Sequence, residues 1–378
     1  MGLKKRPVPY ENVSQQIPAK ELSILLKVSS ALTSTLELAE VLRITIESVT
    51  TLLSIDTGAI YTLENGDLYL GATVPAMPAE FPKELRLAHL KDHPHINESV
   101  TTKKPVYLPD ARKVTLTPAE QVAVKERKLI SLLYYPLLIR DDVIGVFIVG
   151  TSKGVRSFKE NELDLCAALS SQSALAISNA KLYKQAQQAI ADITKAYDAT
   201  LEGWSRVLDM RDHVTDQHTH RVADLTVDLA KKMDIPVTEL GNIRRGALLH
   251  DIGKMGIPDA ILQKPDVLTD AEWKTMKKHP EMAYQFLSHI SYLQPALEIP
   301  LCHHEKWDGT GYPRKLKGEE IPLAARIFTV VDVYDALTSE RPYRKAWKKE
   351  DALAYIREQA GKHFFPEAVD AFLEMIGD

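Results

Sequence analysis

The chain has few of the features that mark secreted or nucleic-acid-binding proteins. Its 378 residues include two cysteines, Cys166 and Cys302, which lie far apart and form no CxxC pattern. This usage argues against a disulfide framework and fits a reducing cytoplasm. The formal net charge of -4 argues against a general binder of polymeric nucleic acid, which needs a basic surface.

Long hydrophobic runs are also missing. No run approaches the roughly 20 apolar residues that a membrane-spanning helix needs. The opening residues, MGLKKRPVPY, carry charge but no apolar stretch of the secretory type, and they lack the serine or threonine of a myristoylation signal. We therefore expect a cytoplasmic protein of two or three domains, without a membrane partner.

Histidine usage divides the chain into two halves. Nine of the twelve histidines lie between His213 and His363, whereas His89, His93 and His95 form a cluster in the first half. Histidine is a common metal ligand and proton carrier. We therefore expect the two halves to do different chemistry.

The first half is predicted to mix helix and strand. Apolar residues recur at helical spacing from Leu22 to Leu53. The segment 58–74 predicts two strands joined by a turn at residues 64–67, and a second strand pair is predicted over 129–140 and 143–151. This order of elements, with the ending FKENELDLCAALSSQSALAISNAKLY, resembles a GAF domain over roughly residues 20–183.

The GAF resemblance implies an α+β sensor domain with an antiparallel sheet flanked by helices. It leaves the ligand open, because GAF domains bind cyclic nucleotides, haem, bilins or small metabolites, and many only dimerise. His89, His93 and His95 are candidate haem or metal ligands. The favoured interpretation is that they are exposed loop residues, because charged residues and Pro94 lie among them.

A long helix is predicted to follow this domain. Ser157 and Glu160 form a capping-box pattern, and neither glycine nor proline occurs from there to Glu202. A heptad pattern runs along it, which favours a parallel coiled coil joining two protomers over one helix packing on its own domain. Its two rows are Leu175, Leu182, Ala189 and Ala196, and Asn179, Ala186, Ile193 and Thr200.

The second half is predicted to be all helical, and several of its segments carry metal-ligand residue types. His218 shares a helical face with Val222 and Leu229, so it points toward the core, where it must be hydrogen-bonded or ligated. An apolar stripe ends at the adjacent pair His250 and Asp251, which can supply an imidazole and a bridging carboxylate. Further candidates are His279 and Asp332, the latter within an apolar helix.

The string HHEKWDGTGYP, from His303 to Pro313, is the most informative motif. Its glycines and proline cannot continue a helix and predict an irregular loop. Adjacent imidazoles on a helix cannot point the same way, so His303 and His304 are expected to serve different places or different metal ions. A turning loop beside metal-ligand residues indicates a substrate pocket.

The ordered motifs RDxxTxxHxxRV, HDIGK, HP, HHEKWDGTGYP and DVYDALTSERPYR resemble the HD-domain metal-dependent phosphohydrolases, and specifically the HD-GYP subfamily. Members of that subfamily hydrolyse cyclic di-GMP. The resemblance covers roughly residues 198–375. We therefore divide the chain into a tail at 1–19, a GAF-like domain at 20–183, a coiled-coil linker helix at 184–200 and an HD-GYP domain at 201–378.

By this resemblance, Asp251 bridges two divalent metal ions. His218, His250 and Asp332 serve one ion, and His279, His303 and His304 serve the other. Imidazole and carboxylate without thiolate favour iron, with manganese the alternative. A hydroxide held between the ions would attack phosphorus and open the ring to pGpG, and a second cycle would give GMP. Family members with three metals have a glutamate where this chain has Val214, which favours two metals here.

Several residues are predicted to bind substrate. Lys254 would neutralise charge on the phosphate, so Lys254 and Asp251 are the catalytic candidates. Tyr312 is predicted to contact the nucleotide, and three arginines are candidates for phosphate or guanine edges. These arginines are Arg314, Arg341 and Arg344. Glu305 is expected to orient a ligand histidine.

Three functions follow as hypotheses. The first is a cyclic di-GMP phosphodiesterase that the GAF domain regulates through the linker helix. The second is a phosphodiesterase for cyclic GMP-AMP, because some related HD-GYP proteins prefer that substrate. The third is a receptor that binds a cyclic dinucleotide and turns it over slowly.

Overall fold

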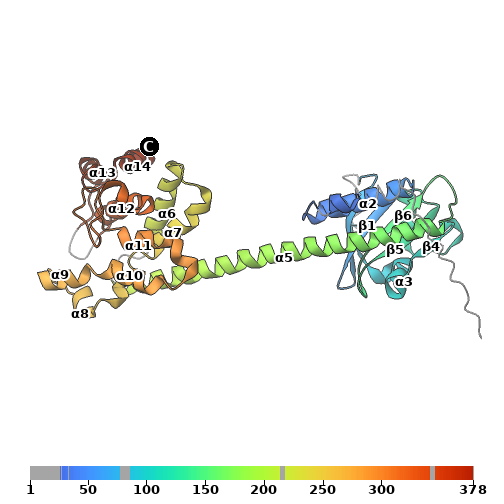
Figure 1. Ribbon diagram of the computed structural model, residues 1–378, viewed down its shortest axis with the longest axis horizontal. Coiled ribbons are helices and arrows are strands. Elements are labelled where there is room, and N and C mark those ends of the chain that lie inside the picture. The colour runs from blue at the N-terminus through green and yellow to red at the C-terminus, as the bar shows by residue number, and fades with distance from the viewer. Residues whose placement is uncertain are drawn as a thin grey trace, which may run out of the picture. The chain divides into compact units, whose positions relative to one another are not determined.

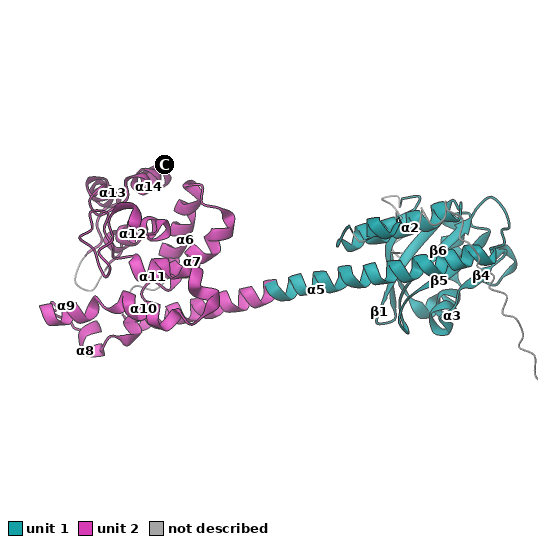
Figure 2. Ribbon diagram, viewed as in Figure 1, with its two compact units in different colours: residues 1–190 teal, residues 191–378 magenta. Residues whose placement is uncertain are grey.

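The computed structural model describes residues 26, 28–32, 34–76, 86–212, 218–340 and 345–377. The chain divides into two compact units, residues 1–190 and 191–378 (Figure 2). Among the described residues, no helix combines the length and the apolar character needed to cross a membrane.

The first unit is built on one six-stranded antiparallel sheet with strand order β3-β2-β1-β6-β5-β4 (Figure 1). Its strands are β1 (Thr57–Glu64), β2 (Asp67–Val74), β3 (Leu87–His89), β4 (Val106–Leu108), β5 (Ser131–Ile139) and β6 (Asp142–Thr151). Its helices are α2 (Leu38–Leu52), α3 (Pro94–Thr102), α4 (Pro118–Glu126) and the start of α5 (Glu160–Arg211), with short 3-10 turns at Leu90–Asp92 and Ala111–Lys113.

The two faces of this sheet carry separate cores, because successive strand residues point to opposite faces. On β1, Ile60 belongs to the core covered by α2 and α5, whereas Tyr61 belongs to the core on the other face. On β5, Leu133 and Leu132 divide in the same way. The α3 and α4 side therefore has its own apolar interior, separate from the helical layer of α2 and α5.

Both strand pairs predicted from the sequence are present. β1 and β2 are joined at Asn65 and Gly66, which both have positive φ (52° and 86°), as a two-residue hairpin turn requires. β5 and β6 are joined at Arg140, which also has positive φ (54°). The alternating pattern and the turn residues were sufficient to predict both hairpins.

The helical spacing from Leu22 to Leu53 does not form one continuous helix in its described part. Residues 28–32 are helical, but residues 35–37 are not, and α2 begins only at Leu38. The break has a local cause. The Ser34 hydroxyl donates to the Ala31 carbonyl, and the Thr35 hydroxyl accepts from the Glu37 amide, so side chains replace backbone helix bonds.

α5 begins slightly later than the predicted capping box. The amide of Lys159 donates to the Glu162 carboxylate at 2.9 Å, so a glutamate caps the helix start two residues later than the Ser157 and Glu160 pattern predicted. The helix is 52 residues long, as the absence of glycine and proline to Glu202 suggested. All residues from 182 to 193 are exposed.

The second unit is helical. Its helices are the end of α5, α6 (His218–Lys232), α7 (Val237–Leu248), α8 (Asp259–Leu262), α9 (Asp270–Met276), α10 (His279–Leu287), α11 (Glu298–Cys302), α12 (Leu323–Thr338), α13 (Lys349–Glu358) and α14 (Pro366–Gly377). Short 3-10 turns lie at Ile252–Gly256, Ser291–Ala296 and Gly318–Glu320. The core joins α6, α7, α12 and α14 through residues such as Val222, Ala247, Phe328 and Phe372.

Candidate metal centre

The predicted ligands come from five segments of the second unit, and most lie at helix ends rather than inside helices. At a helix end, a side chain can project into a shared interior without being fixed on one helical face. The segments are His218 at the start of α6, His250 and Asp251 in the turn after α7, His279 at the start of α10, His303 and His304 directly after α11, and Asp332 within α12.

The structure brings these seven side chains into two groups. Within each group the ligand atoms all lie within 4.8 Å of one another, which is close enough for one ion to contact them. The first group is Asp251, His279, His303 and His304, and the second is His218, His250 and Asp332. The resemblance implied the same division.

Asp251 lies between the two groups. Its Oδ1 atom is 3.3 Å from Nε2 of His279 and 3.8 Å from Nε2 of His303. Its Oδ2 atom is 3.1 Å from Nε2 of His250. One carboxylate therefore directs one oxygen to each group, which is the arrangement that a bridging ligand needs.

The expectation that His303 and His304 serve different places is wrong. Both belong to the group of Asp251, and their ring centroids are 4.0 Å apart. The reason is that α11 ends at Cys302, so the two residues lie in the turn after the helix. The angular rule for neighbours on a helix does not apply there.

The ring nitrogens of three histidines are fixed by backbone carbonyls. Nδ1 of His250 donates to Ala247, Nδ1 of His279 donates to Met276, each at 2.8 Å, and Nδ1 of His303 lies 3.1 Å from the Pro300 carbonyl. In its neutral form with the proton on Nδ1, each ring would direct the lone pair of Nε2 inward. Nε2 of His279 and Nε2 of His303 lie 3.3 Å apart, so both nitrogens face the same space, where one cation could contact both.

The protonation states of these groups suit a divalent ion. Burial lowers the pKa of His303 and His304 well below the ordinary value, and neighbouring imidazoles lower it further. Burial opposes ionisation of Asp251, but Lys254 and His250 hold its pKa well below the usual range. Burial also opposes charge on His250, but Asp251 raises its pKa to about 9, so an ion binding there would displace a proton.

Asp335 is a functional residue that the sequence reasoning missed. Its Oδ2 atom is 2.5 Å from Nδ1 of His218, and Arg221 holds the same carboxylate at 2.9 Å. Burial raises the pKa of Asp335, but His218 and Arg221 outweigh this and lower it to about 2. Asp335 therefore orients His218 in the way that carboxylates orient metal-bound histidines. It lies one helical turn after Asp332 in DVYDAL, and that spacing was an available signal.

Lys254 lies beside the bridging carboxylate. Its Nζ atom is 2.7 Å from Oδ2 of Asp251 and 2.8 Å from Oδ2 of Asp212. Burial alone would lower the pKa of Lys254, but the two carboxylates raise it, so the side chain is an ammonium ion. The structure thus places Asp212, just after α5, on this lysine.

Gly253 in HDIGK allows the turn after α7 to approach the start of α10. A Cβ atom at this position would lie 1.8 Å from the carbonyl oxygen of His279 and 2.7 Å from the amide nitrogen of Ala283. The turn after α7 and the start of α10 can therefore touch only because residue 253 has no side chain. This contact brings His279 next to Asp251.

The GYP loop packs against the first group. The Tyr312 ring stacks on His304 with centroids 4.7 Å apart. A Cβ atom on Gly311 would lie 2.4 Å from the amide nitrogen of Lys306, so only glycine fits. The expectation that Glu305 orients a histidine is not what the contacts show. Its buried carboxylate accepts from the amides of Arg314 and Leu316, which ties down the loop.

Of the three arginines predicted to bind substrate, the structure describes one, Arg314. Arg314 is exposed, and its positive charge acts against the rise that burial causes in the pKa of the Cys302 thiol. Arg341 and Arg344 lie outside the described residues. Val214, on which the choice of two metals rather than three depended, also lies outside them.

Comparison with known protein families agrees with both halves of this description. Residues 203–368 match the family model of the HD domain, and residues 35–178 match that of the GAF domain. The chain joins a GAF domain to an HD domain. The prediction of these two domains, in this order and with these fold classes, is confirmed.

The relatives that match the second half of the chain are named as cyclic-dinucleotide phosphodiesterases. The chain is 43% identical over 176 residues to the cyclic di-GMP phosphodiesterase response regulator RpfG of Xanthomonas campestris, covering 46% of this chain and 47% of that protein. It is 40% identical over 196 residues to a cyclic di-GMP phosphodiesterase of Thermotoga maritima, covering 51% and 53%. It is 36% identical over 187 residues to the 3'3'-cGAMP-specific phosphodiesterase 2 of Vibrio cholerae, covering 49% and 36%. The chain thus spans about half the length, or less, of these relatives.

Proposed function

We propose that the HD domain hydrolyses cyclic di-GMP to pGpG, and in a second cycle to GMP, and that the GAF domain regulates this activity. The observation that carries the proposal is the position of Asp251, with one oxygen toward each histidine group. The names of the relatives at 43% and 40% identity support the substrate class.

Two divalent metal ions fit the two groups. His279, His303 and His304 would hold one, His218, His250 and Asp332 would hold the other, and Asp251 would contact both. The donor set of imidazoles and carboxylates without thiolate favours iron, with manganese the alternative. When bound, the ions would polarise the phosphate and lower the pKa of the attacking water.

The side chains around these groups account for substrate binding. The Lys254 ammonium, held between Asp251 and Asp212, would contact a phosphate oxygen and neutralise its developing charge. The Tyr312 ring, stacked on His304, would pack against a guanine base at the edge of the site. Arg314, Arg341 and Arg344 remain candidates for the second phosphate. Overall, water adds across the bond between phosphorus and the ribose 3′ oxygen, and the ring opens.

Two alternative functions use the same site. The first is a cyclic GMP-AMP phosphodiesterase, because relatives at 36% and 38% identity are named as 3'3'-cGAMP-specific enzymes. The second is a receptor that binds a cyclic dinucleotide and turns it over slowly.

The deciding experiment is a turnover assay on anaerobically prepared protein loaded with iron or manganese. Both cyclic dinucleotides are supplied, products are separated by chromatography, and metal content is measured in the same samples. We expect linearisation of cyclic di-GMP, with Asp251→Ala removing both metal and turnover. Asp228→Ala, at an exposed residue, is the control. Metal-loaded protein that binds a dinucleotide without cleaving it would support the receptor instead.

A second copy of the chain is the proposed partner of α5. Residues 182–193 are all exposed, and an exposed helix is only marginally stable in water. Large exposed apolar residues recur at heptad spacing, which supports a coiled-coil dimer. These residues are Tyr183, Ile190, Tyr197 and Trp204 in one row, and Ile193 and Val207 in the other.

The first row of this seam lies one position further along the helix than the predicted first row. Tyr183, Ile190 and Tyr197 stand in place of Leu182, Ala189 and Ala196. Ile193 belongs to both versions. Light scattering on the full chain tests the dimer, and the variants test the register. We expect Ile190→Asp to give monomers, and Ala189→Asp and Lys195→Asp to leave the dimer intact. A monomeric parent chain would exclude the partner, and a monomer from Ala189→Asp alone would restore the original seam.

A further inference from the structure

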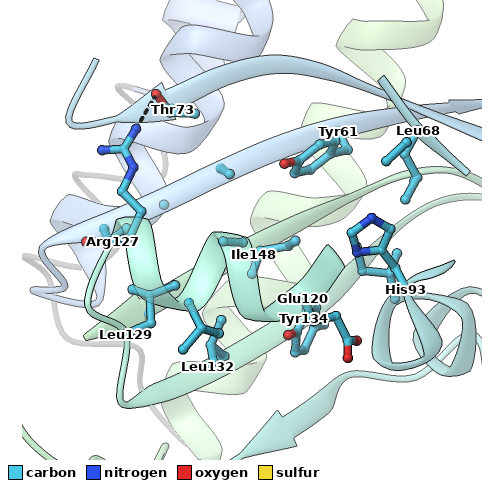
Figure 3. Close-up of a pocket in the computed structure, with 18 residues that line it drawn as sticks. Tyr61, Leu68, Thr73, His93, Glu120, Arg127, Leu129, Leu132, Tyr134 and Ile148 are labelled. Carbon is cyan, nitrogen blue, oxygen red and sulfur yellow. Dashed lines mark hydrogen bonds between the residues drawn. The ribbon is translucent and has the colours of Figure 1, made fainter. Parts of the chain in front are cut away.

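The GAF domain contains a pocket on the sheet face covered by α3 and α4 (Figure 3). Strands β1, β2, β5 and β6 contribute residues to its lining. Most of the side chains that line it are aliphatic, and the labelled ones in Figure 3 are Leu68, Leu129, Leu132 and Ile148. Apolar walls with a few polar groups are typical of sites that hold small molecules.

His93 is one polar side chain of this lining. The expectation that it is an exposed loop residue is wrong, because the residue is only 7% exposed and lines the pocket. Burial lowers the pKa of His93, so the ring is neutral at pH 7 and has one donor and one acceptor nitrogen. Within the described part of the chain, no group hydrogen-bonds to either ring nitrogen.

Tyr134, on β5, lines the same end of the pocket (Figure 3). It is only 4% exposed, and burial raises the pKa of its hydroxyl, which therefore keeps its proton. Its ring stacks on His95 with centroids 5.9 Å apart, but the hydroxyl has no hydrogen-bond partner among the described residues. A buried polar group without a partner costs about 1–3 kcal/mol. Two such groups in one apolar pocket indicate a place for a ligand.

The two charged side chains of this lining are already engaged. Glu120 accepts from the amide of Thr117 at 3.1 Å, which caps α4, and it contacts Nδ1 of His95 at 2.7 Å. Arg127, at the other end of the pocket, donates to the Thr73 hydroxyl at 3.3 Å, and this is not its only interaction (Figure 3). A charged ligand would therefore lose its hydration without meeting a counter-charge that is ready to replace it.

We propose that this pocket binds an uncharged aromatic molecule through a polar group that both donates and accepts hydrogen bonds. The unprotonated nitrogen of His93 accepts from that group, and the Tyr134 hydroxyl donates to it. The ring of the ligand lies against the aliphatic walls. Water would bond the same polar atoms in the ligand-free pocket, but a ring also buries apolar surface, which favours its binding over water. A phenol hydroxyl and a primary carboxamide both have the required bonding capacity.

The test is an NMR titration of the full chain with four one-ring probes, observed on the probe. Phenol and benzamide carry the polar group. Toluene and acetophenone are their matched controls, because a methyl group replaces the hydroxyl in one and the amide nitrogen in the other. We expect phenol or benzamide to bind saturably, with a Kd on the order of 1 mM or tighter. The matched control should bind roughly 3- to 10-fold more weakly.

Tyr134→Phe removes the hydroxyl and keeps the ring. We expect this variant to bind phenol or benzamide only as tightly as the matched control, and to bind toluene unchanged. The hydroxyl has no partner among the described residues, so the melting temperature of the probe-free protein should not fall. A hydroxyl with a structural role would lower it. Tyr69→Phe, at an exposed tyrosine outside the pocket lining, is the control.

His93→Phe removes both ring nitrogens and keeps an aromatic side chain. We expect it to weaken phenol or benzamide roughly 3- to 10-fold as well. His89→Phe, at an exposed histidine outside the lining, is its control. Calorimetric unfolding verifies that each variant is folded. If His93→Phe is not, Tyr134→Phe alone decides.

Four results would overturn the proposal. The first is no saturable binding of phenol or benzamide to the folded parent chain at millimolar concentration. The second is toluene and acetophenone binding as tightly as phenol and benzamide. The third is binding that Tyr134→Phe leaves unchanged. The fourth is benzoate binding more tightly than benzamide, which would mean that the pocket selects a charge. All of these measurements are independent of phosphodiesterase activity, so the proposal stands or fails separately from the function of the HD domain.

Discussion

Lys254 donates a hydrogen bond of 2.8 Å to Asp212, a residue 42 positions earlier in the chain. Asp212 directly follows α5, whose last residue is Arg211. Arg211 in turn binds the carbonyls of Lys254 and Ile257 and the carboxylate of Asp259. The end of the long helix therefore holds both the backbone and the side chain of the catalytic candidate Lys254.

Replacing Asp212 with asparagine should lower turnover without removing metal. The substitution keeps the shape but removes the charge that positions the Lys254 ammonium. We expect kcat to fall roughly 10- to 100-fold, the range seen when a supporting partner of an active-site group is lost. Turnover and metal content are measured on the same preparation, with Asp228→Asn as the control. Full activity, or loss of metal, would contradict this role.

Replacing Asp335 with asparagine should weaken one metal group and spare the other. Asp335 accepts a hydrogen bond from Nδ1 of His218 and so fixes the direction of that ring. We expect metal affinity in the group of His218 to fall roughly 10- to 100-fold. Competition with a chelator, followed ion by ion, measures it. Equal weakening of both ions, or of neither, would argue against an orienting role.

Adding one methyl group at Gly253 should destabilise the HD domain. The new Cβ atom would lie 1.8 Å from the His279 carbonyl, so α10 must shift. We expect Gly253→Ala to cost about 1–3 kcal/mol or more and to reduce metal content. Gly241→Ala is a matched control, because its Cβ would meet nothing closer than 3.4 Å and alanine favours the interior of α7. Calorimetric unfolding compares the two, and equal effects would refute the contact argument.

Acidification should destabilise the GAF domain through His93. Burial lowers the pKa of His93 in the folded state below its ordinary value of 6.5. The unfolded chain therefore binds more protons as the pH falls below about 6.5, and stability decreases there. We expect His93→Asn to reduce the loss of melting temperature between pH 7.5 and 5.5. His89→Asn, at an exposed histidine, serves as the control. An unchanged pH dependence in His93→Asn would show that another group causes the loss.

The sequence by itself determined the two domains and both hairpins, and its resemblance to the HD-GYP subfamily implied two ligand groups. Hairpins follow from alternation and from turn residues such as Asn65 and Gly66, which are local properties. The ligand groups were implied by that resemblance, which the order of motifs along residues 198–375 carries. These features were readable because each depends on neighbours in the chain or on a recognisable spacing.

Tertiary contacts decided the rest. Asp335 orients His218 across 117 residues, and Asp212 holds Lys254 across 42. The spacing in DVYDAL marks Asp335 as a residue near the site, but only the fold shows which side chain each carboxylate contacts. His93 resembles a loop histidine in the sequence, because its burial depends on helices and strands that pack over it from distant segments. Spacing along the chain names the groups that can bind a metal, whereas packing between segments decides which side chains hold them in place.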